Sequence, residues 1–464
     1  MITIPFDHIM GLWEEARSKS SFINQSVLIS YTKQIEDQDP FTFFQNSEKY
    51  FPGQRFFWSN PDHSHIIVGA GITQEFTVKD DENRYQSIEK QWKRFIEEAV
   101  CKYEVEEVGP VIFGGFSFDP KKEKTSLWSQ FSDALFILPT FMLTILKGKT
   151  FITINYLSDF NKLHLQNLVA TEEDLLKPIS VKQLSTTSIV KCVEMDPSEW
   201  KQSISNVTKR ISEGVMDKVV LAREMRVLFD NDINVLPVLE HLMEEQSNSY
   251  IYTFERGNDC FLGATPEQLV KKDGKNVQSM CLAGSIARGE DVLEDEEYGQ
   301  TLLQDEKNIH EHELVVKMIR ASLEEVCSQV HTPDRPSLYK MKHIQHLHTP
   351  VKAITTENKS ITDFVKLLHP TPALGGFPQD VAMETIREVE KLDRGWYAGP
   401  LGWMDYKQDG EFIVSIRSGL LQAREASLFA GCGVVEDSDP ESEYKETQIK
   451  FKPMLSALGG NPSK

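Results

Sequence analysis

The chain has 464 residues, of which 40% are hydrophobic and 26% are charged, and this is the composition of an ordinary globular protein. Its 70 acidic residues against 50 basic residues give a formal net charge of -20, which argues against nucleic acid or an anionic membrane as the main partner. Any anionic substrate would therefore have to meet a local group of cationic side chains.

The start of the chain and its cysteines predict a cytoplasmic protein. The N-terminus lacks the basic start and apolar run of a signal peptide, and no stretch of about 18 apolar residues occurs anywhere. The six cysteines are scattered without CxxC spacing, which favours reduced thiols over a disulfide framework or a zinc knuckle. Length alone would favour two or three domains of common size.

The first part of the chain predicts mixed strands and helices. The stretch GPVIFGGFSFDP (109–120) indicates a buried strand, and its glycine pair (114–115) indicates close backbone packing. Residues 138–157 predict a hairpin with its turn near 147–149. A connection is predicted at 177–188, before the second part begins.

A helix and a strand are predicted next. Asp196 is a good N-cap, Pro197 suits the first helical position, and Gly214 suits the end of the helix. Between them, apolar residues recur at helical spacing: Trp200, Ile204, Val207 and Ile211. Residues 217–229 are apolar and β-branched, so they predict a strand.

A long helix is predicted over roughly residues 296–326. It has two apolar stripes, which indicate that it is covered on two sides: Leu302, Ile309, Val316, Ile319, Leu323 and Val326 form the first, and Leu314, Val315 and Met318 form the second. By this spacing Glu311 points into the second apolar layer, where a carboxylate needs a partner, a cation or a metal.

The histidines beside Glu311 do not predict a zinc site. His310 and His312 diverge by about 200° around a helix axis, so they cannot easily bind one metal. Leu314 also breaks the HExxH spacing of a zinc protease. We expect His310 to lie on a solvated face and His312 to lean toward the core.

The C-terminal region predicts antiparallel strands. The strands expected at 411–421 and 426–435 are close neighbours in the sequence, which favours direct antiparallel pairing. Helices and strands alternate before them. We therefore predict an α+β fold of layered α/β/α type rather than a doubly wound parallel sheet.

Several stretches resemble, in the same order, motifs of the chorismate-utilising enzymes, which include isochorismate, salicylate, anthranilate and aminodeoxychorismate synthases. They are DKVVLAR (217–223), FLGATPEQLV (261–270), LAGSIARG (282–289), DEKNIHEHELV (305–315), IQHLHTPV (344–351), HPTPALGGFP (369–378), DRGWYAGPLGW (393–403), FIVSIRSGL (412–420) and AGCGVVEDSDPESEYKET (430–447). The first part, in VLISYTKQIEDQDPFTFF (27–44) and FGGFSFDP (113–120), is also similar to the longer, menaquinone-specific isochorismate synthases.

The resemblance implies two large, mostly antiparallel β-sheets packed face to face with helices outside. It implies one chorismate-utilising fold over 1–464, with a variable N-terminal portion (1–188) and a catalytic portion (189–464). The implied reaction is the Mg²⁺-dependent conversion of chorismate to isochorismate, as the first step of menaquinone biosynthesis. Water adds at C2 and the C4 hydroxyl leaves, so the site needs a base, an acid and cations for the substrate carboxylates.

The resemblance assigns the acid, the base and the metal ligands. Lys218 falls at the position of the family's general base, and a lysine acts as a base only as the neutral amine. From the residue alone, the alternative is an exposed lysine on an edge strand. Glu267 falls at the general acid, and the alternative is a glutamate at a helix N-terminus after a proline. Glu311 and Glu446 fall at the magnesium ligands, with Glu443 contacting the metal through water.

The other implied site residues bind the substrate. Arg417 and Tyr397 match the pair that holds the enolpyruvyl carboxylate, and alternation along its strand turns Arg417 away from the apolar face. Gly431 and Gly433 would let backbone amides approach the same group, and Lys450 would add positive charge. The remaining positions line the ring: Gly284, Ser285 and His346. For His346, a satisfied core histidine stays an equal alternative.

Two residues separate the possible activities within the family. Lys218 favours water over ammonia as the nucleophile, and Ala283 stands where aminodeoxychorismate synthases carry a lysine.

Asn308 stands where an acidic residue is common, which bears on the number of outer carboxylates and on metal affinity. Salicylate synthase, a siderophore-pathway isochorismate synthase and a non-catalytic scaffold are the alternatives. We expect one small substrate, chorismate, no nucleic-acid or membrane partner, and a monomer or weak homodimer.

Overall fold

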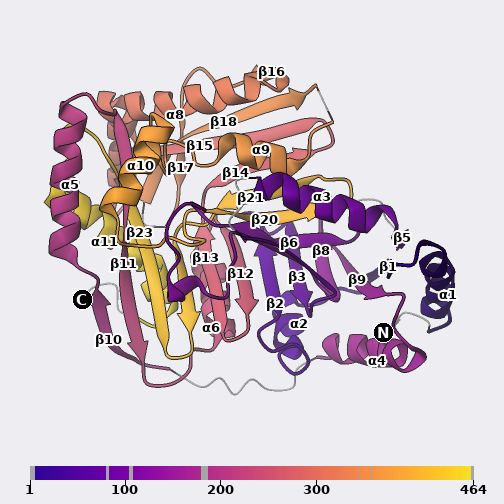
Figure 1. Ribbon diagram of the computed structural model, residues 1–464. Helices are drawn as coiled ribbons and strands as arrows, with labels where there is room; N and C mark the ends of the chain where they lie inside the picture. The colour runs from indigo at the N-terminus through magenta and orange to yellow at the C-terminus, as the bar shows by residue number, and fades with distance from the viewer. Residues whose placement is uncertain are drawn as a thin grey trace.

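Two large β-sheets form the centre of the molecule (Figure 1). The computed structural model describes residues 6–79, 83–103, 108–178, 187–342, 344–356 and 358–460, so most of the connection expected at 177–188 lies outside the described residues. Within the described ranges one sheet has 13 strands and the other has 10, and every pairing is antiparallel except that of β1 with β5. The predicted α+β class with two mostly antiparallel sheets is therefore confirmed.

Strands from both parts of the chain build each sheet. The larger sheet runs, in spatial order, β10 (Ile189–Glu194), β11 (Lys218–Phe229), β23 (Glu425–Val434), β22 (Ser418–Gln422), β13 (Asp259–Thr265), β12 (Tyr250–Arg256), β2 (Arg55–Ser59), β3 (His65–Ala70), β8 (Phe141–Leu146), β9 (Lys149–Leu157), β1 (Leu28–Ile35) and β5 (Val100–Tyr103), with β19 (Gly376–Phe377) beside β11. The predicted hairpin at 138–157 is β8 and β9, which join at residues 147–148.

The smaller sheet mixes the two parts of the chain in the same way. Its order is β16 (Cys327–His331), β18 (Ile344–Thr355), β15 (Asn276–Ala287), β14 (Gln268–Asp273), β21 (Gly410–Val414), β20 (Pro400–Asp405), β6 (Val111–Phe116), β7 (Ala134–Leu138) and β4 (Gln74–Val78), with β17 (Ser337–Lys340) beside β18. Because β6 pairs with β20, early and late segments share one hydrogen-bonded ladder.

Helices cover the outer faces of both sheets (Figure 1). The larger sheet carries α1 (Phe6–Ile23), α2 (Pro40–Ser47), α6 (Val235–Glu245) and α11 (Pro440–Ala457), and α4 (Lys162–Leu175) packs against α1 and α2. The smaller sheet carries α3 (Arg84–Glu97), α7 (Val292–Gln304), α8 (Glu306–Glu324) and α9 (Ile361–Leu368), while α5 (Pro197–Ser212) and α10 (Gln379–Val389) lie beside β11. A short 3₁₀ helix spans Ser126–Trp128.

Aromatic side chains from both sheets fill the core between them. The Phe113 ring of β6 lies 6.0 Å from the Trp58 ring and 5.9 Å from the Phe254 ring, both of which belong to the larger sheet. The predicted close packing at Gly114 is confirmed, because a Cβ there would lie 2.0 Å from the carbonyl oxygen of Leu135. The two sheets thus meet through a dense apolar layer.

The predicted helix–strand unit around residues 196–229 forms as α5 and β11. All the apolar residues predicted on its buried face are buried: Trp200, Ile204, Val207 and Ile211. Asp196 holds the N-cap position, but its backbone is left-handed (φ 42°) and its side chain makes no capping hydrogen bond. The capping part of the prediction is therefore wrong, although the helix begins where expected.

Two other predicted elements are interrupted in the structure. The single helix expected over 296–326 is two helices, because Asp305 has an extended backbone (ψ 106°) and its carboxylate caps α8 by accepting the Asn308 N–H. The single strand expected over 411–421 is also two, and β21 and β22 belong to different sheets. Arg417, between them, has a left-handed backbone (φ 52°), so strand alternation does not orient it and that prediction is wrong.

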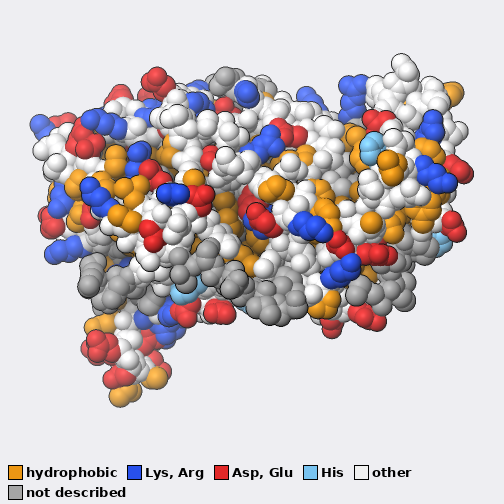
Figure 2. All heavy atoms as spheres, turned by 90° about the horizontal axis from the view of Figure 1, so that it is seen from below, with side chains coloured by type: hydrophobic (Ala, Val, Ile, Leu, Met, Phe, Trp, Pro, Cys, Tyr) orange, Lys and Arg blue, Asp and Glu red, His pale blue; other side chains and the backbone are white. Residues whose placement is uncertain are grey.

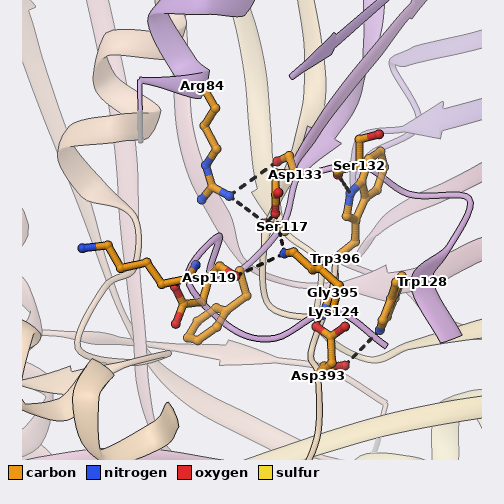
Figure 3. Close-up of polar contacts among 12 residues, drawn as sticks. Arg84, Ser117, Asp119, Lys124, Trp128, Ser132, Asp133, Asp393, Gly395 and Trp396 are labelled. Carbon is orange, nitrogen blue, oxygen red and sulfur yellow. Dashed lines mark hydrogen bonds and ion pairs between the residues drawn. The ribbon is translucent and has the colours of Figure 1, made fainter. Parts of the chain in front are cut away.

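The segment between β6 and β7 contacts the residues just before β20 (Figure 3). The Trp128 indole N–H donates to the Asp393 carbonyl at 3.0 Å. The Trp396 indole N–H donates to the Ser132 carbonyl at 2.9 Å. Gly395 has a positive φ of 50°, and a Cβ on it would lie 2.1 Å from the Trp128 ring. An early segment of the chain therefore holds a late segment in place.

On the face seen in Figure 2, acidic and basic side chains are interspersed with scattered apolar ones. Across the described residues no helix is long and apolar enough to cross a membrane.

Candidate active site

A cavity of about 330 Å³ is lined on one side by β11 and β23 of the larger sheet. On the other side it is lined by β15 and β18 of the smaller sheet and by α8. Every site residue predicted from the sequence lines it: Lys218, Glu267, Gly284, Ser285, Glu311, His346, Tyr397, Arg417, Gly431, Gly433, Glu443, Glu446 and Lys450. The structure therefore brings the predicted residues together from distant segments of the chain.

Lys218 enters the cavity from the start of β11. The residue is 8% exposed, and its Nζ lies 3.6 Å from Glu311 Oε2. A Cβ on Gly433 would lie 2.8 Å from Lys218 Cε, so the missing side chain at Gly433 leaves the space that the lysine stem fills. The reading of Lys218 as an exposed edge lysine is therefore wrong.

Glu267 occupies the turn that carries the chain from one sheet to the other. It follows β13 of the larger sheet and precedes β14 of the smaller one, so it does not begin a helix and that alternative is wrong. Its side chain is buried, and burial raises its pKa to about 7 although the positive charges of Lys450, Lys218 and Arg417 act in the opposite direction. The carboxyl can therefore hold a proton near neutral pH.

The segment around Glu311 distributes its polar side chains over three environments. His310 is exposed and His312 is fully buried, as the helical spacing predicts. Burial also lowers the pKa of His312 to about 4, so its ring is neutral. Glu311 does not point into an apolar layer as expected. Its partly exposed carboxylate faces Lys218 across the cavity, because β11 rather than another apolar element lies opposite this side of α8.

Two glutamates one helical turn apart project from α11. Glu446 Oε1 lies 2.5 Å from Lys450 Nζ, and Glu443 Oε1 accepts a hydrogen bond from the Ser438 hydroxyl at 2.8 Å. Burial, and then the charge of Glu446, raise the pKa of Glu443. Burial would also raise the pKa of Glu446, but Lys450, together with the charges of Arg417 and Lys218, lowers it below its ordinary value. This side of the cavity therefore carries two mutually repelling carboxylates, one held by Lys450 and the other by Ser438.

The carboxylates fit a magnesium ion better than a zinc ion. Glu311, Glu443 and Glu446 supply only hard oxygen donors, which Mg²⁺ prefers, and Mg²⁺ uses one or two carboxylates together with waters and substrate oxygens. Among the described residues no group of three or more histidine, cysteine, aspartate or glutamate side chains is placed to hold a metal ion by itself. The donor set is therefore suited to an ion that shares its coordination sphere with a substrate.

Arg417 is a buried cation without an acidic partner. The residue is 6% exposed, and within the described ranges its guanidinium has no carboxylate at ion-pair distance. Burial lowers its pKa from the ordinary value. An unpaired charge in such a place is costly unless an anion arrives. The arrangement therefore indicates an anionic ligand in the cavity.

Tyr397 lines the same cavity as the Arg417 guanidinium. Burial raises its pKa, so the phenol keeps its proton and can donate a hydrogen bond. A Cβ on Gly431 would lie 3.3 Å from the Tyr397 hydroxyl. The backbone before Tyr397 is held by the buried Glu390–Arg394 ion pair and by the Arg394 Nη2 bond to the Val220 carbonyl at 2.7 Å.

The β23 backbone at Gly431 and Gly433 presents polar groups to the cavity. These residues pair with Ala222 and Val220 of β11, whose own N–H groups bond elsewhere, to Glu390 Oε1 and to the Gly375 carbonyl. Each is therefore a non-hydrogen-bonded pair, and in an antiparallel ladder the two residues of such a pair direct their N–H and C=O groups away from each other. The glycine amides therefore point away from β11, on the side where β22 pairing has already ended.

The opposite wall contains a bulge in β15. The pairing register with β18 shifts between Ala283 and Ser285, and Gly284 there has a φ of +78°. The Ser285 hydroxyl lies 2.9 Å from His346 Nδ1, while His346 Nε2 is buried without a hydrogen-bond partner. Burial lowers the pKa of His346 to about 3, so its ring is neutral. His346 is thus not a fully satisfied core histidine.

Sequence reasoning gave no role to several lining residues. Arg394 and Leu374 both belong to motifs quoted above, yet neither was singled out, because their contribution depends on contacts between distant segments. Asn308 also lines the cavity, where a Cβ on Gly284 would lie 3.0 Å from its Oδ1. The position of Asn308, three residues before Glu311, was already noted in the sequence, and the structure adds that its side chain lies against the bulge at Gly284.

Comparisons with known proteins agree with this geometry. The family model described as "Chorismate binding enzyme" matches residues 14–459. The chain is 47% identical to isochorismate synthase MenF of Bacillus subtilis over 454 residues, which cover 96% of each protein. It is 34% identical to the salicylate biosynthesis isochorismate synthase of Pseudomonas aeruginosa, over 97% of this chain and 95% of that one.

A solved structure shares the fold over nearly the whole chain. It is that of MenF, the menaquinone-specific isochorismate synthase from Escherichia coli. The TM-score is 0.77 at 25% sequence identity, and the match covers 97% of this chain and 99% of the other.

Proposed function

The chain belongs to the family of chorismate binding enzymes, and we propose that it is an isochorismate synthase of menaquinone biosynthesis. The observation that carries this proposal is the buried Glu267, whose pKa of about 7 suits a general acid, in one cavity with the buried Lys218. The unpaired Arg417 beside them suits an anionic substrate.

Substrate binding would begin with the enolpyruvyl carboxylate. The planar guanidinium of Arg417 can bind a carboxylate with two parallel hydrogen bonds, and the Tyr397 hydroxyl can add a third. The amides of Gly431 and Gly433 face the same space. Lys450 lies beside this group and adds positive charge. Gly284, Ser285 and His346 would then line the ring from the opposite wall.

Lys218 and Glu267 would carry the chemical step. The neutral amine of Lys218 removes a proton from water as the water oxygen bonds to C2 of the ring. The two ring double bonds shift, the C4–O bond breaks, and Glu267 gives its proton to the departing oxygen, which leaves as water. One water is added and one is lost, so the reaction is an isomerisation. The two residues end with protonation states opposite to those at the start and must exchange a proton with solvent before the next turnover.

Glu311, Glu446 and, through water, Glu443 would hold a magnesium ion. When bound, the ion would neutralise the ring carboxylate of the substrate and compete with Lys218 for Glu311. The carboxylates themselves orient the acidic side of the cavity, while Lys450 keeps Glu446 in place through their 2.5 Å contact.

The organisation of the protein follows from the same proposal. We infer one folding unit over 1–464, in which 1–188 is a variable portion and 189–464 carries the catalytic residues, because both sheets combine strands from both portions. Every proposed site residue comes from one chain, which supports action as a monomer or weak homodimer. The six free cysteines support a cytoplasmic location.

Product analysis tests the proposal. Purified protein incubated with chorismate and magnesium chloride is expected to form isochorismate, and a matched sample with a chelator is expected to form none. The products are separated by liquid chromatography. Salicylate together with pyruvate would contradict the proposal in favour of a salicylate synthase. An absence of turnover with water or ammonia would contradict it in favour of a non-catalytic scaffold.

A further inference from the structure

His312 links the helix that carries Glu311 to the sheet beneath it. The side chain is 1% exposed. Its Nδ1 lies 3.1 Å from the Ala283 carbonyl oxygen, and its Nε2 lies 2.7 Å from Thr349 Oγ1. A carbonyl only accepts hydrogen bonds, so Nδ1 carries the proton and donates it, and Nε2 accepts from the threonine hydroxyl. One neutral imidazole thus bonds to both β15 and β18.

Both ends of this link adjoin residues proposed for the site. On the helix, His312 directly follows Glu311. On the sheet, Ala283 directly precedes the bulge at Gly284, where the register with β18 shifts. Ser285, on the far side of the bulge, contacts His346. The imidazole therefore joins the segment that holds a proposed metal carboxylate to the segment that lines the ring.

The other contacts of α8 with the sheet have little directionality. Its buried residues besides His312 are apolar: Val315, Ile319 and Leu323. Apolar contacts hold a helix against a sheet but tolerate small rotations and shifts along its axis, whereas hydrogen bonds fix distance and direction. In the described part of the chain, every side-chain hydrogen bond between α8 and the smaller sheet involves His312, including the weak contacts from Cys281 Sγ to its ring and carbonyl.

We propose that His312 is a positioning residue that fixes Glu311 relative to the Ala283–Ser285 bulge and thereby sets the magnesium affinity of the site. This inference rests on the proposed function, because it takes Glu311 as a magnesium ligand. Residues that orient metal ligands commonly change metal affinity by about 10- to 100-fold when they are replaced. His312 would do so through the rotation and axial position of α8 rather than by touching the metal or the substrate.

Three variants separate the two hydrogen bonds of the ring. Asparagine can place its amide N–H near the position of Nδ1 and keep the bond to Ala283. Glutamine reaches the position of Nε2 and keeps only the bond to Thr349. Leucine keeps neither. His310→Leu is the matched control, because His310 lies on the same helix and is exposed.

Magnesium chloride titrations monitored by calorimetry and by thermal unfolding test the proposal. His312→Leu and His312→Gln are expected to weaken magnesium affinity about tenfold, whereas His312→Asn and His310→Leu stay within about threefold of wild type. Saturating magnesium is expected to restore much of kcat in the weakened variants, which a general loss of folded protein would not allow. If the leucine variant does not fold, the glutamine–asparagine pair gives the same comparison.

The outcomes distinguish this inference from the proposed function. Wild-type affinity in folded His312→Gln, or equal weakening in the asparagine and glutamine variants, would overturn the positioning role alone. Wild-type protein that binds no magnesium, with or without chorismate, would overturn the proposed metal site and this inference with it.

Discussion

Replacing Glu267 with glutamine is expected to reduce turnover by about 10²- to 10⁴-fold while stabilising the folded protein at pH 8. Glutamine has nearly the same size and shape but has no carboxyl proton to give to the departing hydroxyl. The rate loss follows from the role of Glu267 as the acid. The gain in stability follows from its burial, because an ionised carboxylate in this cavity is poorly solvated.

The sign of the stability effect depends on pH. The pKa of Glu267 is about 7 in the folded protein against 4.5 for an ordinary glutamate. The raised pKa therefore contributes its full stabilisation of the folded state only below about pH 4.5. That contribution is lost as pH rises through 7. Above pH 7 the ionised group disfavours folding by about 3 kcal/mol, on the order of 1.4 kcal/mol for each pKa unit.

Urea unfolding at pH 5 and pH 8 measures this effect. Glu267→Gln is expected to be more stable than wild type by about 3 kcal/mol at pH 8 and by little at pH 5. Glu313→Gln, an exposed substitution on α8, serves as the control and should change neither stability nor rate. A Glu267→Gln variant that turns over normally, or that is less stable at pH 8, would contradict the assignment.

Replacing Lys218 with glutamine is expected to reduce kcat by about 10²- to 10⁴-fold, because no other group is proposed to activate the attacking water. Lys218→Arg is the more informative variant. Arginine keeps the positive charge and the contact with Glu311, but it cannot become a neutral base. Both variants should therefore be inactive if Lys218 is the base. Steady-state kinetics with saturating chorismate and magnesium, together with circular dichroism to verify folding, measure the effect.

The arginine variant also separates two roles of the lysine. If Lys218 acts only as a cation for the substrate, arginine would retain most of the wild-type kcat. A nearly wild-type rate in Lys218→Arg would thus contradict proton abstraction by this residue.

The spacing of apolar residues predicted those helices and strands whose burial is visible within a single segment. The apolar spacing from Trp200 to Ile211 predicted α5, and the β-branched run after Lys218 predicted β11, because burial of one helix face or of both strand faces leaves a direct trace in residue order. The overall architecture came instead from the resemblance of many motifs in order. Periodicity alone could not pair β6 with β20, whose residues are almost 300 positions apart.

Interruptions within apolar runs were missed. The strand around Arg417 reads as continuous, because residues on both sides are apolar and the change of sheet is set by the stacking of the two sheets. The break at Asp305 was also missed, although aspartate is a strongly preferred residue at a helix N-cap. Missing the change of sheet misdirected Arg417, whereas the expected direction of Glu311 was wrong because Lys218 of β11 lies opposite this side of α8.

The candidate site was predicted at the level of residues but not of contacts. All the residues predicted for the site meet around the cavity, although other lining residues were not singled out, and the individual roles stay predictions. The pairing of Lys218 with Glu311, the space that Gly433 leaves for the lysine and the hydrogen bonds of His312 depend on three segments meeting in space. Such contacts leave no spacing signal within any one segment.

The most direct test of the account is the origin of the new hydroxyl oxygen. Isochorismate formed in water enriched with ¹⁸O, with magnesium present, is expected to contain one solvent oxygen, located at C2, while recovered chorismate that has not reacted carries none. Mass spectrometry and ¹³C NMR of the product measure this. Unlabelled isochorismate would show that the C4 oxygen migrates within the substrate, and it would contradict the roles of Lys218 as base for water and of Glu267 as acid for a departing hydroxyl.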